Sequence, residues 1–149
     1  MAKEKLIKSK ERVRNHGEVF TPEWVVKAMC DLLEKEHCGE DMYEIEKTFL
    51  EPACGTGNFL VEIFARKLNH CKDTTDAIKA LNSIFAIELL QDNVDEARAR
   101  LLTMFKDAYP NADGFEIQLA QTILENNVIQ GNTLELQDWL INEKWFTVI

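Results

Sequence analysis

The sequence predicts an α/β fold built on a parallel sheet. Short apolar stretches alternate along the chain with longer stretches whose apolar residues recur at helical spacing, the pattern of parallel strands connected by helices. The first two apolar stretches end in a carboxylate, Glu51 and Glu88, and the third is followed shortly by Asn132. Because ligands of such sheets bind beyond the carboxyl ends of the strands, we expect these three polar side chains at one site.

The N-terminal region is basic, whereas the rest of the chain is acidic. The 149 residues carry a formal net charge of −9, but residues 1–14 hold six bases and two acids, so the remainder carries −13. A basic segment can contact nucleic-acid phosphates, but a solvated, mobile terminus is the favoured interpretation. We therefore assign residues 1–15 to a basic N-terminal arm and residues 16–149 to a single domain.

A helix is predicted to begin next to Pro22. Thr21 suits the N-cap, Pro22 the first helical position and Glu23 the first turn. The apolar residues that follow recur at helical spacing, at positions 24, 25, 28, 29, 32 and 33. Residues 38–46 are polar and are expected to link this helix to the first strand.

The first strand is predicted over residues 47–51, and a tight glycine turn follows it. Gly55 and Gly57 can adopt positive φ and let a ligand approach the backbone. The next helix opens at Asn58 and points its first free N–H groups towards the turn. A dinucleotide fingerprint has a third glycine where this sequence has Leu60, and the Lys of a P-loop is absent. By itself the turn is equally consistent with an ordinary strand-to-helix connection.

The remaining elements continue the alternation of helix and strand. The expected helices are 58–70, 74–82, 91–108, 113–126 and 134–142, and the expected strands are 84–88, 127–130 and 145–149. Pro110 prevents the helix 91–108 from continuing. No apolar run approaches the ~18 residues that cross a bilayer, which predicts no membrane contact and favours a cytoplasmic location.

The four cysteines, at positions 30, 38, 54 and 71, form no C-x-x-C pair. Two His-Cys dipeptides, at 37–38 and 70–71, could supply four zinc ligands, but their surroundings do not support a metal site. We expect four free thiols, as is usual in a reducing cytosol, and no bound metal.

Two stretches of sequence resemble motifs of a known enzyme family. Residues 17–22 read Gly-Glu-Val-Phe-Thr-Pro, and residues 50–60 read Leu-Glu-Pro-Ala-Cys-Gly-Thr-Gly-Asn-Phe-Leu. They resemble the opening motif and the S-adenosylmethionine loop of adenine-specific (N6) DNA methyltransferases of the restriction-modification type, a group that includes type I modification subunits and type II amino-methyltransferases. Residues 84–89 and 129–134 are similar to the strands that bind the ribose and the adenine of the cofactor in that family. The resemblance implies a Rossmann-like, S-adenosylmethionine-dependent methyltransferase fold for residues 16–149.

The resemblance also implies a role for individual residues. Glu51 would attract the ammonium of the cofactor, Glu88 would accept both ribose hydroxyls, and Asn132 would accept from the adenine N6, with Leu89 against the ring. The family more often has Asp at position 132, although an Asn oxygen can also accept. The implied cofactor-binding residues are Phe20, Thr21, Glu51, Pro52, Ala53, Cys54, Gly55, Gly57, Glu88, Leu89, Asn132 and Thr133.

The catalytic motif of that family, Asp/Asn-Pro-Pro-Tyr/Phe, does not occur among the 149 residues. We therefore expect an N-terminal cofactor-binding part, truncated after the fourth strand, that holds no catalytic residue and reaches double-stranded DNA through further C-terminal parts. A specificity or restriction subunit is an open partner, and the apolar terminal strand could mediate self-association. The alternatives are a non-catalytic cofactor-binding or protein-interaction module, and a methyltransferase that acts on protein, RNA or small molecules.

Overall fold

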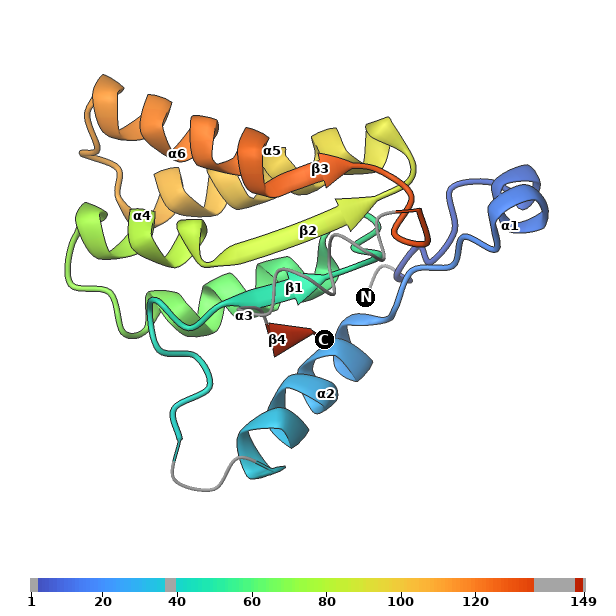
Figure 1. Cartoon of the computed structure of the whole chain (residues 1–149), viewed down its shortest axis with the longest axis horizontal. Helices are drawn as coiled ribbons and strands as arrows, with labels where there is room; N and C mark the ends of the chain where they lie inside the picture. Colours follow the sequence, from blue (N-terminus) through green and yellow to red (C-terminus); the bar gives the residue numbers. More distant parts are fainter. Residues whose placement is uncertain (1–2, 37–39, 136–146, 149) are drawn as a thin grey trace.

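The computed structural model describes residues 3–36, 40–135 and 147–148. Its strands form one parallel sheet, and Figure 1 shows α3 (Asn58–Leu68) and α5 (Gln91–Ala108) behind the strands. The predicted α/β fold with a parallel sheet is therefore confirmed.

The sheet has the strand order β3-β2-β1-β4. The strands are β1 (Phe49–Glu51), β2 (Ile84–Glu88), β3 (Val128–Gln130) and β4 (Thr147–Val148). Every pairing is parallel, and the register places Glu51 opposite Ala86 and Glu88 opposite Gln130. The ends of the first three strands therefore lie at the same edge of the sheet.

Most predicted elements are present with small shifts in their bounds. Three further helices are α2 (Glu23–Glu36), α4 (Thr74–Asn82) and α6 (Gly114–Asn127), and β2, α4 and α5 have the predicted limits. The first strand begins at Phe49 rather than residue 47, because its pairing with β2 begins there. Residues 133–135 form a turn, whereas the rest of the helix expected at 134–142 and residues 145, 146 and 149 of the last strand lie outside the described residues.

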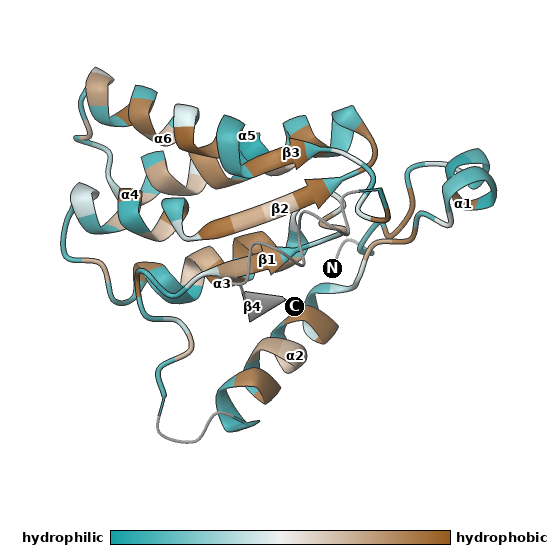
Figure 2. Cartoon of the chain, in the orientation of Figure 1, coloured by the Kyte–Doolittle hydropathy of each residue, from teal (hydrophilic) through white to brown (hydrophobic). Residues whose placement is uncertain are grey.

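The core lies where the apolar faces of the helices meet the sheet. Figure 2 shows β1, β2 and β3 as largely apolar, and Phe49, Ile84, Leu60, Phe64 and Leu101 are all essentially buried. Each large apolar side chain that is fully buried contributes about 1.5–3 kcal/mol of transfer free energy. This packing fixes α3 and α5 relative to the strand ends that they follow.

A buried lysine fastens the segment that leads into β1. Lys67 of α3 is inaccessible to solvent, and its Nζ donates to the carbonyls of Glu44 (2.6 Å), Ile45 (3.1 Å) and Lys47 (2.7 Å). Burial lowers the pKa of Lys67 to about 8, and three carbonyl acceptors suit an ammonium with three donors. The hydrogen bonds of Lys67 thus hold the end of the polar link that was predicted before the first strand.

The N-terminal segment is not the free arm that we favoured from the sequence. It contains a short helix, α1 (Lys10–His16), with Ser9 accepting from the Arg12 amide at its start and Gly17 at its end with φ +62°. Lys8 and Arg12 form ion pairs with Asp92 at the start of α5. The acidic body therefore holds the segment by charge pairing. No helix among the described residues is both long and apolar enough to cross a membrane.

Candidate functional site

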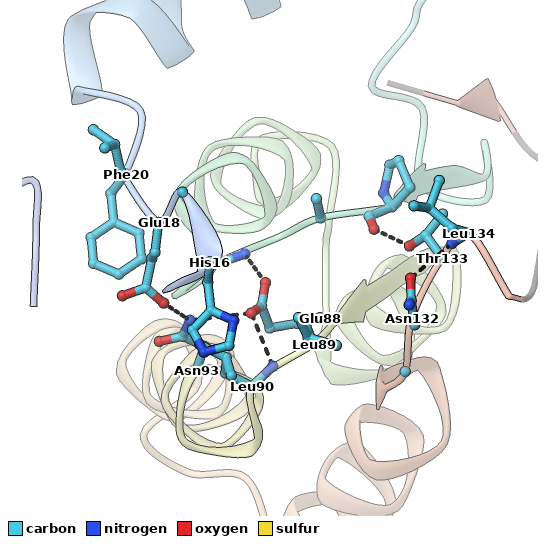
Figure 3. Close-up of a pocket in the computed structure, with 16 residues that line it drawn as sticks. His16, Glu18, Phe20, Glu88, Leu89, Leu90, Asn93, Asn132, Thr133 and Leu134 are labelled. Atoms are coloured by element: carbon cyan, nitrogen blue, oxygen red, sulfur yellow. Dashed lines mark hydrogen bonds between the residues drawn. The ribbon is translucent and has the colours of Figure 1, made fainter. Parts of the chain in front are cut away.

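A cavity of about 470 Å³ opens at the carboxyl ends of β1, β2 and β3. Its walls come from four parts of the chain: the segment after α1, the loop after β1, the β2–α5 junction and the loop after β3 (Figure 3). The lining residues are His16, Gly17, Glu18, Val19, Phe20, Pro52, Ala53, Gly55, Glu88, Leu89, Leu90, Asn93, Gly131, Asn132, Thr133 and Leu134. Glu51, Glu88 and Asn132 thus lie near the same edge of the sheet, as predicted. Glu88 and Asn132 line this cavity.

Glu51 lines a smaller adjoining cavity of about 160 Å³. The two cavities share Phe20 and Gly55 among their lining residues, so they meet at the glycine turn. Thr21, Cys54 and Thr56 also line the smaller one. The site therefore has a large compartment with Glu88 and a small compartment with Glu51.

The two glycines of the turn serve different purposes. Gly55 has φ +55°, and a Cβ placed on it would lie 3.2 Å from a ring carbon of Phe20. Gly57 has φ +91°, and its added Cβ would lie 3.0 Å from the Cβ of Ala97 on α5. Both positions need positive φ, which favours glycine. Gly57 is needed for the close packing of α3 on α5, whereas Gly55 keeps the junction between the two compartments narrow but clear.

Glu88 is held by three hydrogen bonds at the end of β2. Its Oε2 accepts from the Gly55 amide at 2.9 Å, and its Oε1 accepts from the Leu90 amide at 3.1 Å and from Asn93 Nδ2 at 3.2 Å (Figure 3). A carboxylate offers about four lone-pair sites, so roughly one remains for a ligand. Glu88 is thus a rigid acceptor that also ties the glycine turn to β2.

Asn93 and Glu18 belong to the site, although the sequence analysis did not single them out as binding residues. Asn93 Nδ2 donates to Glu18 Oε2 at 2.7 Å as well as to Glu88, and Arg12 donates to the same Glu18 oxygen at 2.7 Å. Asn93 is completely buried, and Glu18 Oε1 and Asn93 Oδ1 are buried without a hydrogen-bond partner in the described structure. The sequence does hold a signal for Asn93: it is a polar residue at helical spacing from Ala97 and Leu101, on the apolar face of α5 that is expected to be buried.

Glu51 is a buried carboxylate with few interactions that offset the cost of burying its charge. It is 8% exposed, and its Oε1 accepts from the Ala53 amide at 3.1 Å. Burial raises the pKa of Glu51 above its usual value, and the nearby charge of Glu88 raises it further. A cation in the small compartment would stabilise the ionised form.

The loop after β3 closes the other end of the large compartment. Asn132 Oδ1 accepts from the Leu134 amide at 3.1 Å, which leaves its second lone pair, and the Thr133 hydroxyl donates to the Pro52 carbonyl. Leu89 lines the cavity and is 47% exposed, so it offers an apolar surface to a ligand. The Thr133 contact joins the loops after β3 and β1.

The opening segment is tied to the glycine turn through Asn58. Its Nδ2 donates to the Thr21 carbonyl at 2.9 Å, and its Oδ1 accepts from Arg100 at 2.9 Å. Arg100 also donates to the Thr56 carbonyl at 2.8 Å. These bonds hold the Phe20 segment against the glycine turn, where the Phe20 ring packs over Gly55, so residues 17–22 and 50–60 form one wall.

Cys54 has a structural place in this wall. It is buried, its amide donates to the Ile87 carbonyl at 3.1 Å, and burial raises the pKa of its thiol well above the usual range. A neutral thiol is a weak nucleophile. Among the described residues no group of three or more His, Cys, Asp or Glu side chains could hold a metal ion.

The charges of the site select the kind of ligand that it can hold. The described residues that line the two compartments include Glu18, Glu51 and Glu88 but no Lys or Arg. The carboxylates would repel the phosphates of a nucleoside triphosphate or a dinucleotide, and no Lys or Arg among the described lining residues offsets that repulsion. It is suited to a ligand with a cationic end and hydroxyl donors.

Comparison with known proteins agrees with this arrangement. The family model described as N-6 DNA Methylase matches residues 4–138, which include the opening segment, the glycine turn and the three strands that end at the site. No curated protein and no solved structure matches the chain. Because the family model covers most of the sequence and every wall of the cavity, the chain belongs to the N-6 DNA methylase family.

Proposed function

We propose that the chain binds S-adenosylmethionine in the two adjoining compartments and provides it for methylation of adenine N6 in DNA. The observation that carries this proposal is the pair of buried carboxylates, Glu51 and Glu88, on either side of the glycine turn, in a site with no Lys or Arg among its described lining residues. The cofactor has an ammonium at one end and a ribose diol nearer the other, which matches the two carboxylates.

The small compartment suits the methionine end of the cofactor. Glu51 has no cationic partner among the described residues, and an ammonium would supply one. Phe20 and Thr21 form the opposite wall, where Asn58 holds the Thr21 carbonyl. These residues would bind and orient the methionine part and exclude water from it.

The large compartment suits the adenosine part. Glu88 has about one free acceptor site, so it would accept one ribose hydroxyl directly. Asn132 has a free lone pair for the adenine N6, and Leu89 offers an apolar face for the ring. Pro52, Ala53 and Thr133 complete the wall between the loops.

When bound, S-adenosylmethionine supplies a methyl group carried on a sulfonium. The residues of this chain would hold and orient the cofactor. Its three prolines stand at positions 22, 52 and 110, so the 149 residues contain no Pro-Pro pair that could serve as the family's catalytic motif. We therefore propose a cofactor-binding role for the chain as given, with transfer requiring a motif beyond these residues.

Isothermal titration calorimetry with S-adenosylmethionine and S-adenosylhomocysteine tests this proposal. We expect one site per chain, and Glu88→Ala should weaken binding about tenfold or more, because a hydrogen bond to a charged group is lost. Glu125→Ala, on the exposed surface of α6, is the matched control and should bind normally. ATP and NAD should bind much more weakly, because the carboxylates of the site repel their phosphates. Absence of binding by the unaltered chain, or equal affinity in the Glu88 variant, would refute the assignment.

A cofactor-binding module that takes no part in transfer is the second candidate, favoured by the absence of a Pro-Pro pair. The family match supports DNA over protein or RNA as the final substrate. An assay of methyl transfer to DNA, with the chain joined to a partner that carries the missing motif, separates the two candidates. Transfer supports the cofactor-binding part of a methyltransferase, and no transfer supports a non-catalytic module.

A further inference from the structure

The basic residues of the N-terminal segment fall into two groups. Lys8 and Arg12 face the body: Lys8 Nζ lies 2.9 Å from Asp92 and 3.1 Å from Glu96, and Arg12 lies 2.6 Å from Asp92 and 2.7 Å from Glu18. These pairs neutralise the acids at the start of α5. They also fix α1 against the body.

The second group faces solvent. Lys3, Lys5, Lys10 and Arg14 are exposed, and none of them has an acidic partner among the described residues. Lys10 and Arg14 are four positions apart in α1, so their side chains lie on the same face of the helix. Glu11 is the one acid within α1. The outward face of α1 is thus positive on a molecule whose remaining residues, after 1–14, are strongly acidic.

This positive face stands at the edge of the candidate cofactor site. Figure 1 shows α1 beyond the carboxyl ends of the strands, and its last residue, His16, lines the large compartment together with Gly17. A base can reach a cofactor bound there only if it is turned out of a duplex that lies across the mouth of the cavity. The phosphates next to that base would then lie close to α1, at the edge of the cavity.

We propose that the outward face of α1, through Lys10 and Arg14, binds the phosphate backbone of double-stranded DNA beside the cofactor site. This inference rests on the proposed function, because it takes DNA to be the substrate. Lys3 and Lys5 extend the positive surface along the preceding segment. The inward pairs of Lys8 and Arg12 hold the helix in position, and the acids that they neutralise no longer repel the phosphates.

Fluorescence anisotropy of a labelled duplex of about 20 base pairs, at several NaCl concentrations from about 20 to 200 mM, tests the proposal. The double variant Lys10→Glu/Arg14→Glu is compared with Lys79→Glu/Lys106→Glu. The second pair is exposed on α4 and α5, away from α1, and changes the net charge by the same amount. Circular dichroism melts confirm that both variants fold, and calorimetry of the cofactor is run in parallel.

We expect the α1 variant to bind DNA at least about tenfold more weakly and to lose roughly two units of salt dependence, about 0.9 for each phosphate contact. The control should change affinity much less. Equal weakening in both variants, or no DNA binding by the unaltered chain at the lowest salt, would overturn the proposal. Cofactor binding without DNA binding would leave the proposed function standing, whereas loss of cofactor binding in the unaltered chain would refute that function independently of the DNA titration.

Discussion

Glu51 carries a carboxylate in a position where burial opposes its charge. It is 8% exposed, it accepts one backbone hydrogen bond from Ala53, and its pKa is raised by burial and by the charge of Glu88. Such a group destabilises the fold of the protein without ligand, and a bound cation removes that destabilisation. The residue that makes the small compartment selective is therefore expected to weaken the fold.

Glu51→Gln should stabilise the protein without ligand and weaken S-adenosylmethionine binding. Glutamine keeps the acceptor for the Ala53 amide but removes the buried charge, so the melting temperature at pH 7 should rise while affinity falls about tenfold. Melting curves with and without the cofactor measure both effects.

The pH dependence of this difference has a defined sign. The raised pKa means that the folded chain takes up a proton on Glu51 at higher pH than the unfolded chain does. The stability deficit of the unaltered chain is therefore complete above the folded-state pKa and disappears as the pH falls towards the ordinary value of 4.5. A gap in melting temperature that persists unchanged down to pH 4.5 would contradict the assignment.

At the scale of elements, Lys67 joins α3 to the segment that leads into β1. Lys67→Met would remove one donor from each of three carbonyls. The Glu44 carbonyl keeps the Lys47 amide at 3.2 Å and the Ile45 carbonyl keeps the Ser83 hydroxyl at 3.0 Å, so the Lys47 carbonyl loses most. The free energy of unfolding should fall by about 1–3 kcal/mol, the cost of one buried unsatisfied group. Urea denaturation measures the change. The control Lys79→Met, at an exposed position of α4, should stay within about 0.5 kcal/mol of the unaltered chain. A similar loss in both variants would show that Lys67 has no special role.

A chain of polar contacts connects α1 to β2. Arg12 holds Glu18, Glu18 accepts from Asn93, and Asn93 donates to Glu88. Because Glu18 and Glu88 both line the large compartment, the position of α1 affects how the cavity is ordered.

Arg12→Ala should therefore weaken cofactor binding, although Arg12 does not line the cavity. We expect a loss of about three- to tenfold, because binding must then order the opening segment without its ion pair. Calorimetry compares this variant with Lys79→Ala, which should bind as the unaltered chain does. If affinity is unchanged in Arg12→Ala, the contacts stabilise the fold without influencing the site.

At the scale of the whole molecule, we expect the chain as given to bind the cofactor without transferring its methyl group. Adenine N6 is a poor nucleophile and has to be oriented by acceptors next to a flipped base. The 149 residues supply no Pro-Pro motif for this task. A filter assay with labelled cofactor and duplex DNA should give no transfer. Transfer at enzymic rates would mean that another group in the chain performs this role.

The sheet also bears on assembly. Among the described strands β4 lies at one edge, next to β1, and a parallel edge strand can pair with another chain. We expect self-association through this edge. Sedimentation velocity over a wide concentration range measures it, and a monomer at every concentration would count against the prediction.

Elements with local signals could be predicted from the amino-acid sequence. β2, α4 and α5 have the predicted bounds, because their limits are set by nearby residues such as the Asp73 N-cap and by Pro110 beyond the end of α5. The strand-end residues Glu51 and Glu88 could be predicted for a similar reason: an apolar run followed by an acid can be recognised within five residues.

The residues that complete the site from distant parts of the chain could not be predicted in this way. The bond between Asn93 and Glu18 spans 75 positions, and that between Arg12 and Asp92 spans 80, so no local pattern could have shown α1 held against α5. The burial of Lys67 depends on three carbonyls in residues 44–47, 20 to 23 positions away, so no local pattern in the sequence indicates it. Periodicity predicts which face of a helix is buried, but hydrogen bonds and ion pairs between buried polar groups depend on how the elements pack together.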